Sequence, residues 1–136
     1  NRHEAAIADD RRTDREAAQE CLASLKARIT RDGGAVLVCE SDGRVTGLLA
    51  MAHATDEPYI VGPLRRHALI TDLVVEESAR GTGIGSSLLA EAEKRARKAG
   101  LGRIMITALH ANEAALRAYQ AAGYGTYLIT LQKPLG

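Results

Sequence analysis

The 136-residue sequence predicts a single α/β (α+β) domain, 1–136, with a mixed, mostly antiparallel central sheet and helices on both faces. Two patterns carry this prediction. Two apolar runs joined through Asp42-Gly43 indicate an antiparallel hairpin, because Asp-Gly favours a tight two-residue turn. Farther along, a strand, a glycine-rich loop, a helix and another strand follow in order, which indicates a right-handed crossover between parallel neighbours.

The first helix is expected after a polar start in which Glu4 to Ala8 are a candidate edge strand. Thr13-Asp14-Arg15-Glu16 has the form of a capping box, which marks a helix start. Asp32-Gly33-Gly34 supplies the stop. The apolar stripe between these signals recurs at helical spacing and consists of Ala18, Cys21, Leu22, Leu25 and Ile29.

The later elements follow from apolar runs and from the residues that interrupt them. Two prolines and Gly62 predict a loop after the hairpin. The exposed edges expected for the outer strands suggest a homodimer. The elements expected in order are strands over 35–40 and 45–53, a loop over 55–66, a buried strand over 68–75, a helix from Ile84 to Gly100, a strand over 103–109, a helix over 112–122 and a last strand over 124–132.

Composition and charge exclude several classes of protein. The 18 Lys and Arg nearly balance the 17 Asp and Glu, so no global field draws the chain to nucleic acid or to a membrane. Four Tyr, with no Phe or Trp, leave few side chains for base stacking. Cys21 and Cys39 resemble small buried hydrophobes of a reducing compartment. We therefore expect a cytoplasmic protein that binds no nucleic acid, no membrane and no metal.

Three glycines alternate in Arg80-Gly81-Thr82-Gly83-Ile84-Gly85, between the buried strand and an amphipathic helix. A helix N-terminus presents unpaired N–H groups that attract anions, and glycines let a phosphate approach that backbone. A P-loop would need Gly-Lys-Ser/Thr, but Ser86-Ser87 follows Gly85, and the dinucleotide pattern G-x-G-x-x-G also fails at Ser86. The loop therefore predicts a pyrophosphate cradle to which Arg80 adds charge, with a ligand-free turn as the alternative.

A second motif occupies the segment from Asn112 to Tyr124, one strand after the glycine loop. Asn112 is a candidate N-cap, Gly123 is a candidate C′ residue, and Leu116 with Tyr119 marks a core-facing side. These structural roles explain each residue singly. They do not explain why this helix follows the glycine loop.

Together the two motifs resemble those of the GNAT superfamily of acetyl-CoA-dependent N-acetyltransferases. Its first signature, Gln/Arg-x-x-Gly-x-Gly/Ala after an apolar strand, is matched by Arg80, Gly83 and Gly85. Its second signature has Asn, then Ala three residues on, Tyr seven on, and Gly and an aromatic at eleven and twelve. Those positions hold Asn112, Ala115, Tyr119, Gly123 and Tyr124. The resemblance covers residues 35–131 and implies the GNAT fold, with strands splayed around the cofactor.

The resemblance also implies an activity and a site. Acetyl-CoA would be the cofactor, CoA the product, and the acceptor a small-molecule or peptide amine that attacks the thioester directly. Tyr119 would be catalytic, because a phenol near the sulfur can protonate the departing thiolate. The residues implied in cofactor binding are Leu73, Val74, Val75 beside the pantetheine arm, Arg80, Gly81, Thr82, Gly83, Ile84, Gly85 and Ser86 around the pyrophosphate, and Asn112, Ala115 and Tyr119 on the other side.

Neither motif predicts the general base. On the third strand, Asp72 is expected to point away from the site unless a bulge rotates it. The face toward the site is expected to hold Leu69, Thr71, Leu73 and Val75, none of which can act as a base. Three histidines remain as candidates: His53, His67 and His110, with His110 best placed by position.

The acceptor side is also open. Residues 55–66 and 123–127 are expected to contribute to it, with Asp56, Glu57 and Tyr59 available to attract a cationic amine. The usual opening of the family, a strand and two helices, is matched here by a single clear helix. Because no base is predicted, a non-catalytic acyl-CoA-binding sensor or partner-recognition module stays the main alternative, and a nucleotide-binding protein comes third.

Overall fold

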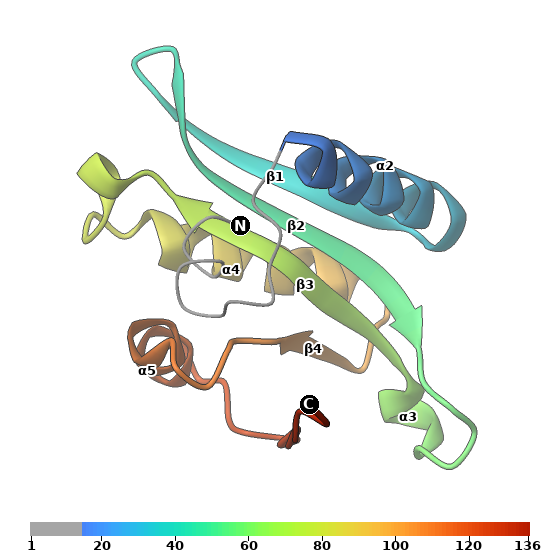
Figure 1. Cartoon of the computed structure of the whole chain (residues 1–136). Helices are drawn as coiled ribbons and strands as arrows, with labels where there is room; N and C mark the ends of the chain where they lie inside the picture. Colours follow the sequence, from blue (N-terminus) through green and yellow to red (C-terminus); the bar gives the residue numbers. More distant parts are fainter. Residues whose placement is uncertain (1–14) are drawn as a thin grey trace.

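The computed structural model describes residues 15–136, so the candidate strand at Glu4 to Ala8 and the cap at Thr13 lie outside the described residues. Four strands form one mixed sheet in the order β1-β2-β3-β4 (Figure 1). β1, β2 and β3 are antiparallel neighbours, and β4 runs parallel to β3, as predicted. Their bounds are Gly34–Ser41 for β1, Arg44–Thr55 for β2, Arg66–Val75 for β3 and Arg103–Ile106 for β4.

The hairpin between β1 and β2 turns at Asp42 and Gly43, whose φ angles are 53° and 77°. A type I′ turn requires positive φ at both central residues, and Asp-Gly adopts it at low steric cost. Ser41 pairs with Arg44 across the turn. The predicted hairpin is therefore confirmed.

Helices cover both faces of the sheet. α2 (Arg15–Asp32) packs against β1 and β2 in front of the sheet, while α4 (Ile84–Lys98) crosses behind it (Figure 1). The last helix, α5 (Glu113–Ala121), follows β4. Apolar residues of α4 at helical spacing bury the rear face of the sheet. The resulting core contains Leu37, Leu49, Met51, Ala68, Ile70, Leu88, Leu89, Ala92 and Ala96.

The start of α4 is fixed against β2 by Gly47. A Cβ atom at this position would lie 2.6 Å from Cγ2 of Ile84 and 3.1 Å from Cδ1 of Leu88. Because no side chain intervenes, the first turn of α4 packs directly on the strand. This contact holds the glycine loop near the carboxyl end of β3.

β3 and β4 pair along four residues and then separate. Their ladder joins His67–Ile70 to Arg103–Ile106. β3 meanwhile stays paired with β2 as far as Val75. Beyond Ile70, the edge of β3 that faces α5 therefore has no strand partner among the described residues. The backbone N–H and C=O groups of residues 71–74 on this edge are available to a ligand.

A β-bulge lies in β3 where the two strands separate. Met51 pairs with Ile70 while Ala50 pairs with Asp72, so Thr71 is the extra residue. The Thr71 hydroxyl donates a hydrogen bond of 3.3 Å to the carbonyl of Ala50. Because a strand alternates its side chains with a period of two, the bulge reverses the facing of every residue after it.

Three elements differ from the prediction. The expected loop over 55–66 contains a one-turn helix, α3 (Gly62–Arg65), because Pro63 suits the first turn of a helix. The strand expected over 103–109 ends at Ile106, since β3 diverges there and leaves no partner. The last strand expected over 124–132 is wrong: a cavity separates these residues from the free edge of β4, so no ladder forms.

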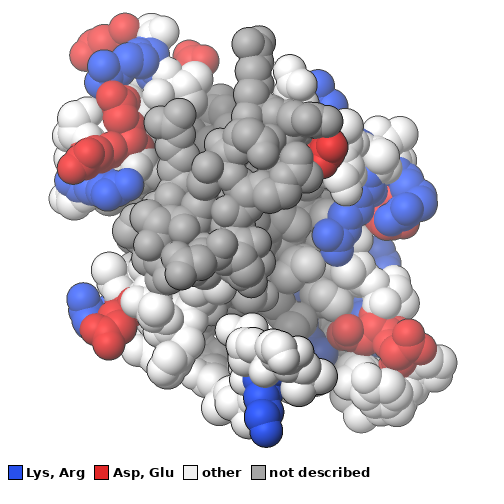
Figure 2. All heavy atoms as spheres, in the orientation of Figure 1, with Lys and Arg blue, Asp and Glu red and all other residues white. Residues whose placement is uncertain are grey.

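Charged side chains of both signs lie near one another on the surface. On the face drawn in Figure 2, Lys and Arg alternate with Asp and Glu over the described residues. The helices carry ion pairs one turn apart, such as Glu91 with Arg95 and Glu113 with Arg117. Across residues 15–136, none of the helices combines the length and the apolar character needed to cross a membrane.

Candidate active site

A cleft of about 490 Å³ lies between the diverging strands, and we call it the fork cleft. One wall is formed by residues 70–75 of β3, and the other by the end of β4 together with α5. Arg80 and Gly85 line it at the start of α4. The fold therefore brings the two sequence motifs to opposite sides of one cleft.

The N-terminus of α4 is free to receive an anion. Its N-cap is Gly83, in the left-handed conformation with φ 87°, and no side chain caps the helix. The first turn also carries no acidic residue. Since the leading N–H groups of a helix lack intrahelical partners, this end presents unsatisfied donors and the positive end of the helix dipole. Such an end matches a pyrophosphate.

Arg80 is tethered beside this helix start. Its Nε donates a hydrogen bond of 3.2 Å to the carbonyl of Val75, the last residue of β3. The bond orients the side chain along the mouth of the fork cleft, which Arg80 lines. The remaining guanidinium donors can bind phosphate oxygens in a planar, bidentate manner.

Asn112 opens α5 on the other wall of the cleft. Its side-chain oxygen accepts a hydrogen bond of 3.2 Å from the backbone N–H of Ala115, and the residue is buried. This is the N-cap role predicted for it, now confirmed. Gly123, with φ 98°, follows the other end of the helix, as expected for a C′ residue.

Tyr119 lines the fork cleft from α5 and packs its ring against a second tyrosine. The ring centroids of Tyr119 and Tyr124 are 6.4 Å apart at 62°, an edge-to-face pair. The Tyr124 hydroxyl donates 3.3 Å to Glu93, and burial together with that carboxylate raises the pKa of Tyr124 well above its usual value. Tyr124 is thus held as a protonated structural partner that supports the Tyr119 ring.

Asp72 belongs to the site, contrary to the orientation predicted for an unbroken strand. The bulge at Thr71 pairs Asp72 with Ala50, whose neighbours Leu49 and Met51 face the core under α4. Asp72 therefore lies on the other face of the sheet, and it lines the fork cleft. The face expected to hold Leu69, Thr71, Leu73 and Val75 is not continuous, because the bulge moves Leu73 onto the core side. The bulge that the sequence left open as the condition for rotating Asp72 is therefore present.

The three histidine candidates lie outside the fork cleft. His110 is exposed and is not part of the lining. His53 is at the far end of β2, where a Cβ on Gly33 would lie 2.7 Å from its Nδ1. His67 is buried at the start of β3, with Nδ1 3.1 Å from Asp56. The residues over 55–66, Glu57 and Tyr59 included, also line neither cavity described here.

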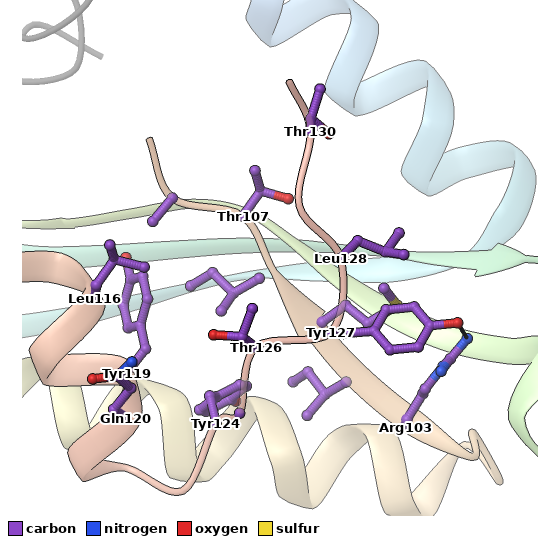
Figure 3. A pocket seen from close by; sticks show the side chains of 15 residues that line it. Arg103, Thr107, Leu116, Tyr119, Gln120, Tyr124, Thr126, Tyr127, Leu128 and Thr130 are labelled. Carbon is purple, nitrogen blue, oxygen red and sulfur yellow. Dashed lines mark hydrogen bonds between the residues drawn. The ribbon is translucent and has the colours of Figure 1, made fainter. Parts of the chain in front are cut away.

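A second cavity, of about 380 Å³, lies between β4 and residues 124–130, and we call it the edge cavity (Figure 3). Tyr119 stands at one end and Arg103 with Tyr127 at the other. Ile106, Thr107 and Tyr119 line both the edge cavity and the fork cleft. The two spaces are therefore neighbours that share a wall at Tyr119.

Most of the residues predicted to bind the cofactor surround the fork cleft. They are Leu73, Val74, Val75, Arg80, Gly85, Asn112, Ala115 and Tyr119. The others, Gly81, Thr82, Gly83, Ile84 and Ser86, lie beside it in the glycine loop and the first turn of α4. The Ile84 side chain packs on the core, so this residue offers a ligand its backbone alone. Within residues 15–136, no group of three or more His, Cys, Asp and Glu side chains could hold a metal ion.

The chain matches the acetyltransferase (GNAT) family over residues 4–124. It is 30% identical over 114 residues to a mycothiol acetyltransferase of Sanguibacter keddieii, an alignment that covers 84% of this chain and 35% of that protein. The chain therefore spans about a third of the length of this curated relative.

Solved structures share the fold. A candidate acetyl transferase from Pyrococcus furiosus superimposes with a TM-score of 0.78 at 22% identity, covering 98% of this chain and 87% of that one. The aminoglycoside N-acetyltransferase AAC(6')-Iy in complex with CoA gives 0.68 at 18% identity, covering 85% and 87%.

An open mixed sheet with diverging strands and a glycine-led helix is the α/β architecture that this chain shares with those solved structures. Because the family match covers residues 4–124, most of the sequence, the chain belongs to the GNAT acetyltransferase family. The resemblance inferred from the two motifs is confirmed. Members of this family use acetyl-CoA and transfer its acyl group to acceptors such as amines.

Proposed function

We propose that this protein is an N-acetyltransferase that moves the acetyl group of acetyl-CoA to a primary amine by direct attack. One observation carries the proposal: a single cleft combines an uncapped helix start, an open strand edge and a tyrosine. The helix start and Arg80 suit the pyrophosphate. The free edge of residues 71–74 suits the amide groups of pantetheine, which would extend the sheet like an added strand.

The side chains of the cleft support the chemistry of acyl transfer. A primary amine must be neutral to attack the thioester carbon, and the Asp72 carboxylate, which lines the cleft, can accept a proton from the incoming ammonium directly or through water. When the C–S bond breaks, the sulfur leaves as a thiolate. The Tyr119 phenol supplies the proton that neutralises it and later regains one from solvent. The nitrogen loses its remaining extra proton to solvent as the amide forms, and Asp72 also passes its proton to solvent. The products are then the amide, CoA and one proton, with both side chains back in their starting states.

Release of free thiol tests this proposal. With acetyl-CoA in excess, we expect at least one member of a panel of amines to raise CoA production above the background of hydrolysis. The panel should span amino acids, peptides, polyamines and aminoglycosides. A protein that binds CoA but releases thiol with none of them would be the sensor or partner-recognition module instead. The presence of Asp72 in the cleft favours the enzyme.

Substituting Asp72 tests its role as the base. Asp72→Asn keeps the size of the side chain but cannot accept a proton, so kcat/KM near neutral pH should fall by about 100-fold. The deficit should shrink as the pH rises toward the pKa of the acceptor amine, about 10 for an alkylamine, because the amine then arrives deprotonated. A deficit that is constant with pH would assign Asp72 a structural role. Acetyl-CoA affinity, measured by calorimetry, should stay near that of the wild type.

A further inference from the structure

We propose that the acceptor occupies the edge cavity and that it is an amine carrying a carboxylate at the far end of an extended chain. The inference rests on the proposed function and names its substrate class. It predicts that Arg103 binds the carboxylate while the nitrogen reaches Tyr119.

The shared wall at Tyr119 places the two cavities on either side of the reacting atoms. If the thioester lies in the fork cleft, the edge cavity reaches the same tyrosine from another side. Ile106 and Thr107, at the end of β4, border both spaces. An acceptor in the edge cavity therefore approaches the thioester past the end of β4, where the strand ladder has stopped.

The lining of the edge cavity selects by charge. Among the described residues that form it, none is Asp or Glu, and Arg103 is the one that carries a permanent charge. The polar groups elsewhere are neutral hydroxyls and an amide, as on Thr107, Thr126 and Gln120. A polycationic amine would lose hydration here without gaining a counter-ion. An acceptor with one amine and one carboxylate meets a complementary charge.

Arg103 is oriented by neighbours that leave part of it available. Its Nη2 donates 3.1 Å to Asp56 and 3.4 Å to the Tyr127 hydroxyl, and its guanidinium carbon lies 4.5 Å from the centre of that ring. Its Nε is buried without a partner. Neither bond uses Nη1, so this nitrogen can donate to a carboxylate from a guanidinium that is held in place in advance. Asp56 also lies 3.1 Å from Nδ1 of His67.

The length of the cavity sets the length of the acceptor. Tyr119 and Arg103 stand at opposite ends in Figure 3, and Ile106, which like Tyr119 lines both cavities, is three residues along β4 from Arg103. Three strand residues span about 10 Å. An extended tripeptide has a similar distance between its amine and its carboxylate. Triglycine is therefore a suitable probe, and triglycinamide is its matched control because it lacks the carboxylate alone.

The experiment compares kcat/KM for triglycine and triglycinamide by thiol release. We expect the wild type to prefer triglycine by about tenfold, mostly through KM, because Arg103 acts far from the reacting atoms. Arg103→Gln should bring the ratio of triglycine to triglycinamide to about one. Arg103→Lys should restore part of the preference. Asp56→Asn should increase it, since the charge of Arg103 would no longer be offset.

A wild-type ratio near one, or a ratio unchanged in Arg103→Gln, would overturn the proposal. So would turnover of spermidine or another polyamine at a higher kcat/KM than triglycine, and so would turnover of other amines with neither tripeptide accepted. In each of these cases thiol release shows that the proposed function stands. Absence of thiol release with every amine would instead refute the proposed function. If Arg103→Gln does not fold, the wild-type pair and Asp56→Asn still decide the question.

Discussion

Replacing Tyr119 by Phe is expected to lower kcat for acetyl transfer by about 100-fold, the lower end of what a positioned acid contributes. The substitution removes one oxygen atom from the wall shared by the two cavities and keeps the aromatic ring that packs against Tyr124. Without the phenol, the departing thiolate must take its proton from water. Acetyl-CoA affinity should change less than threefold, because the cofactor contacts along β3 and α4 are intact. Steady-state rates and calorimetric titration measure the two effects separately.

The matched control is Tyr124→Phe. Tyr124 forms the other half of the aromatic pair, but its hydroxyl donates to Glu93 on α4 and it does not line the fork cleft. Loss of this hydrogen bond should reduce stability by about 1 kcal/mol and leave kcat nearly unchanged. If both variants lost the same activity, the effect would come from packing. If Tyr119→Phe kept the rate of the wild type, Tyr119 would not be the acid.

Gly83→Ala is expected to weaken CoA binding by more than tenfold. Gly83 is the N-cap of α4 at φ 87°, and a Cβ there would meet no protein atom within 4 Å. The added methyl group therefore costs the free protein backbone strain alone, about 1–2 kcal/mol. In the complex it also stands where a pyrophosphate would approach the helix start. Chemical denaturation measures the loss in free energy of unfolding, and calorimetry measures the loss in affinity for CoA.

Gly100→Ala is the control for backbone strain. Gly100 lies just beyond the other end of the same helix, at φ 74°, and a Cβ there also meets nothing within 4 Å. The two variants should therefore lose similar free energies of unfolding, while Gly100→Ala binds CoA like the wild type. Equal CoA affinities for both variants would show that the glycine loop does not hold the ligand.

The sequence predicts the fold well where the signals are local. The Asp42-Gly43 turn, the N-cap at Asn112 and the glycine before Ile84 each depend on chemistry within a few residues, and each is where it was expected. The missing last strand is different. Residues 124–132 have an apolar pattern suited to a strand, but a strand needs a partner edge, and pairing across a cavity cannot occur.

The candidate site is predictable on the cofactor side and poorly predictable on the acceptor side. The glycine loop and the helix from Asn112 are contiguous motifs, so their spacing indicates the cleft that they share. Asp72 was assigned to the wrong face because one extra residue at Thr71 inverts the alternation of the strand. Arg103 carries no local signal, since its partners Asp56 and Tyr127 are distant in sequence and meet it through the fold alone.

The central claim is that acetyl-CoA binds in the fork cleft, and amide NMR of the 136-residue protein titrated with CoA tests it most directly. We predict saturable shifts concentrated in three segments: Leu73–Val75, Gly81–Ser86 and the region around Asn112. Amides of α3, which lies at the other end of β3 and lines neither cavity, should not move. No shifts at millimolar CoA, or shifts centred away from these three segments, would contradict the account.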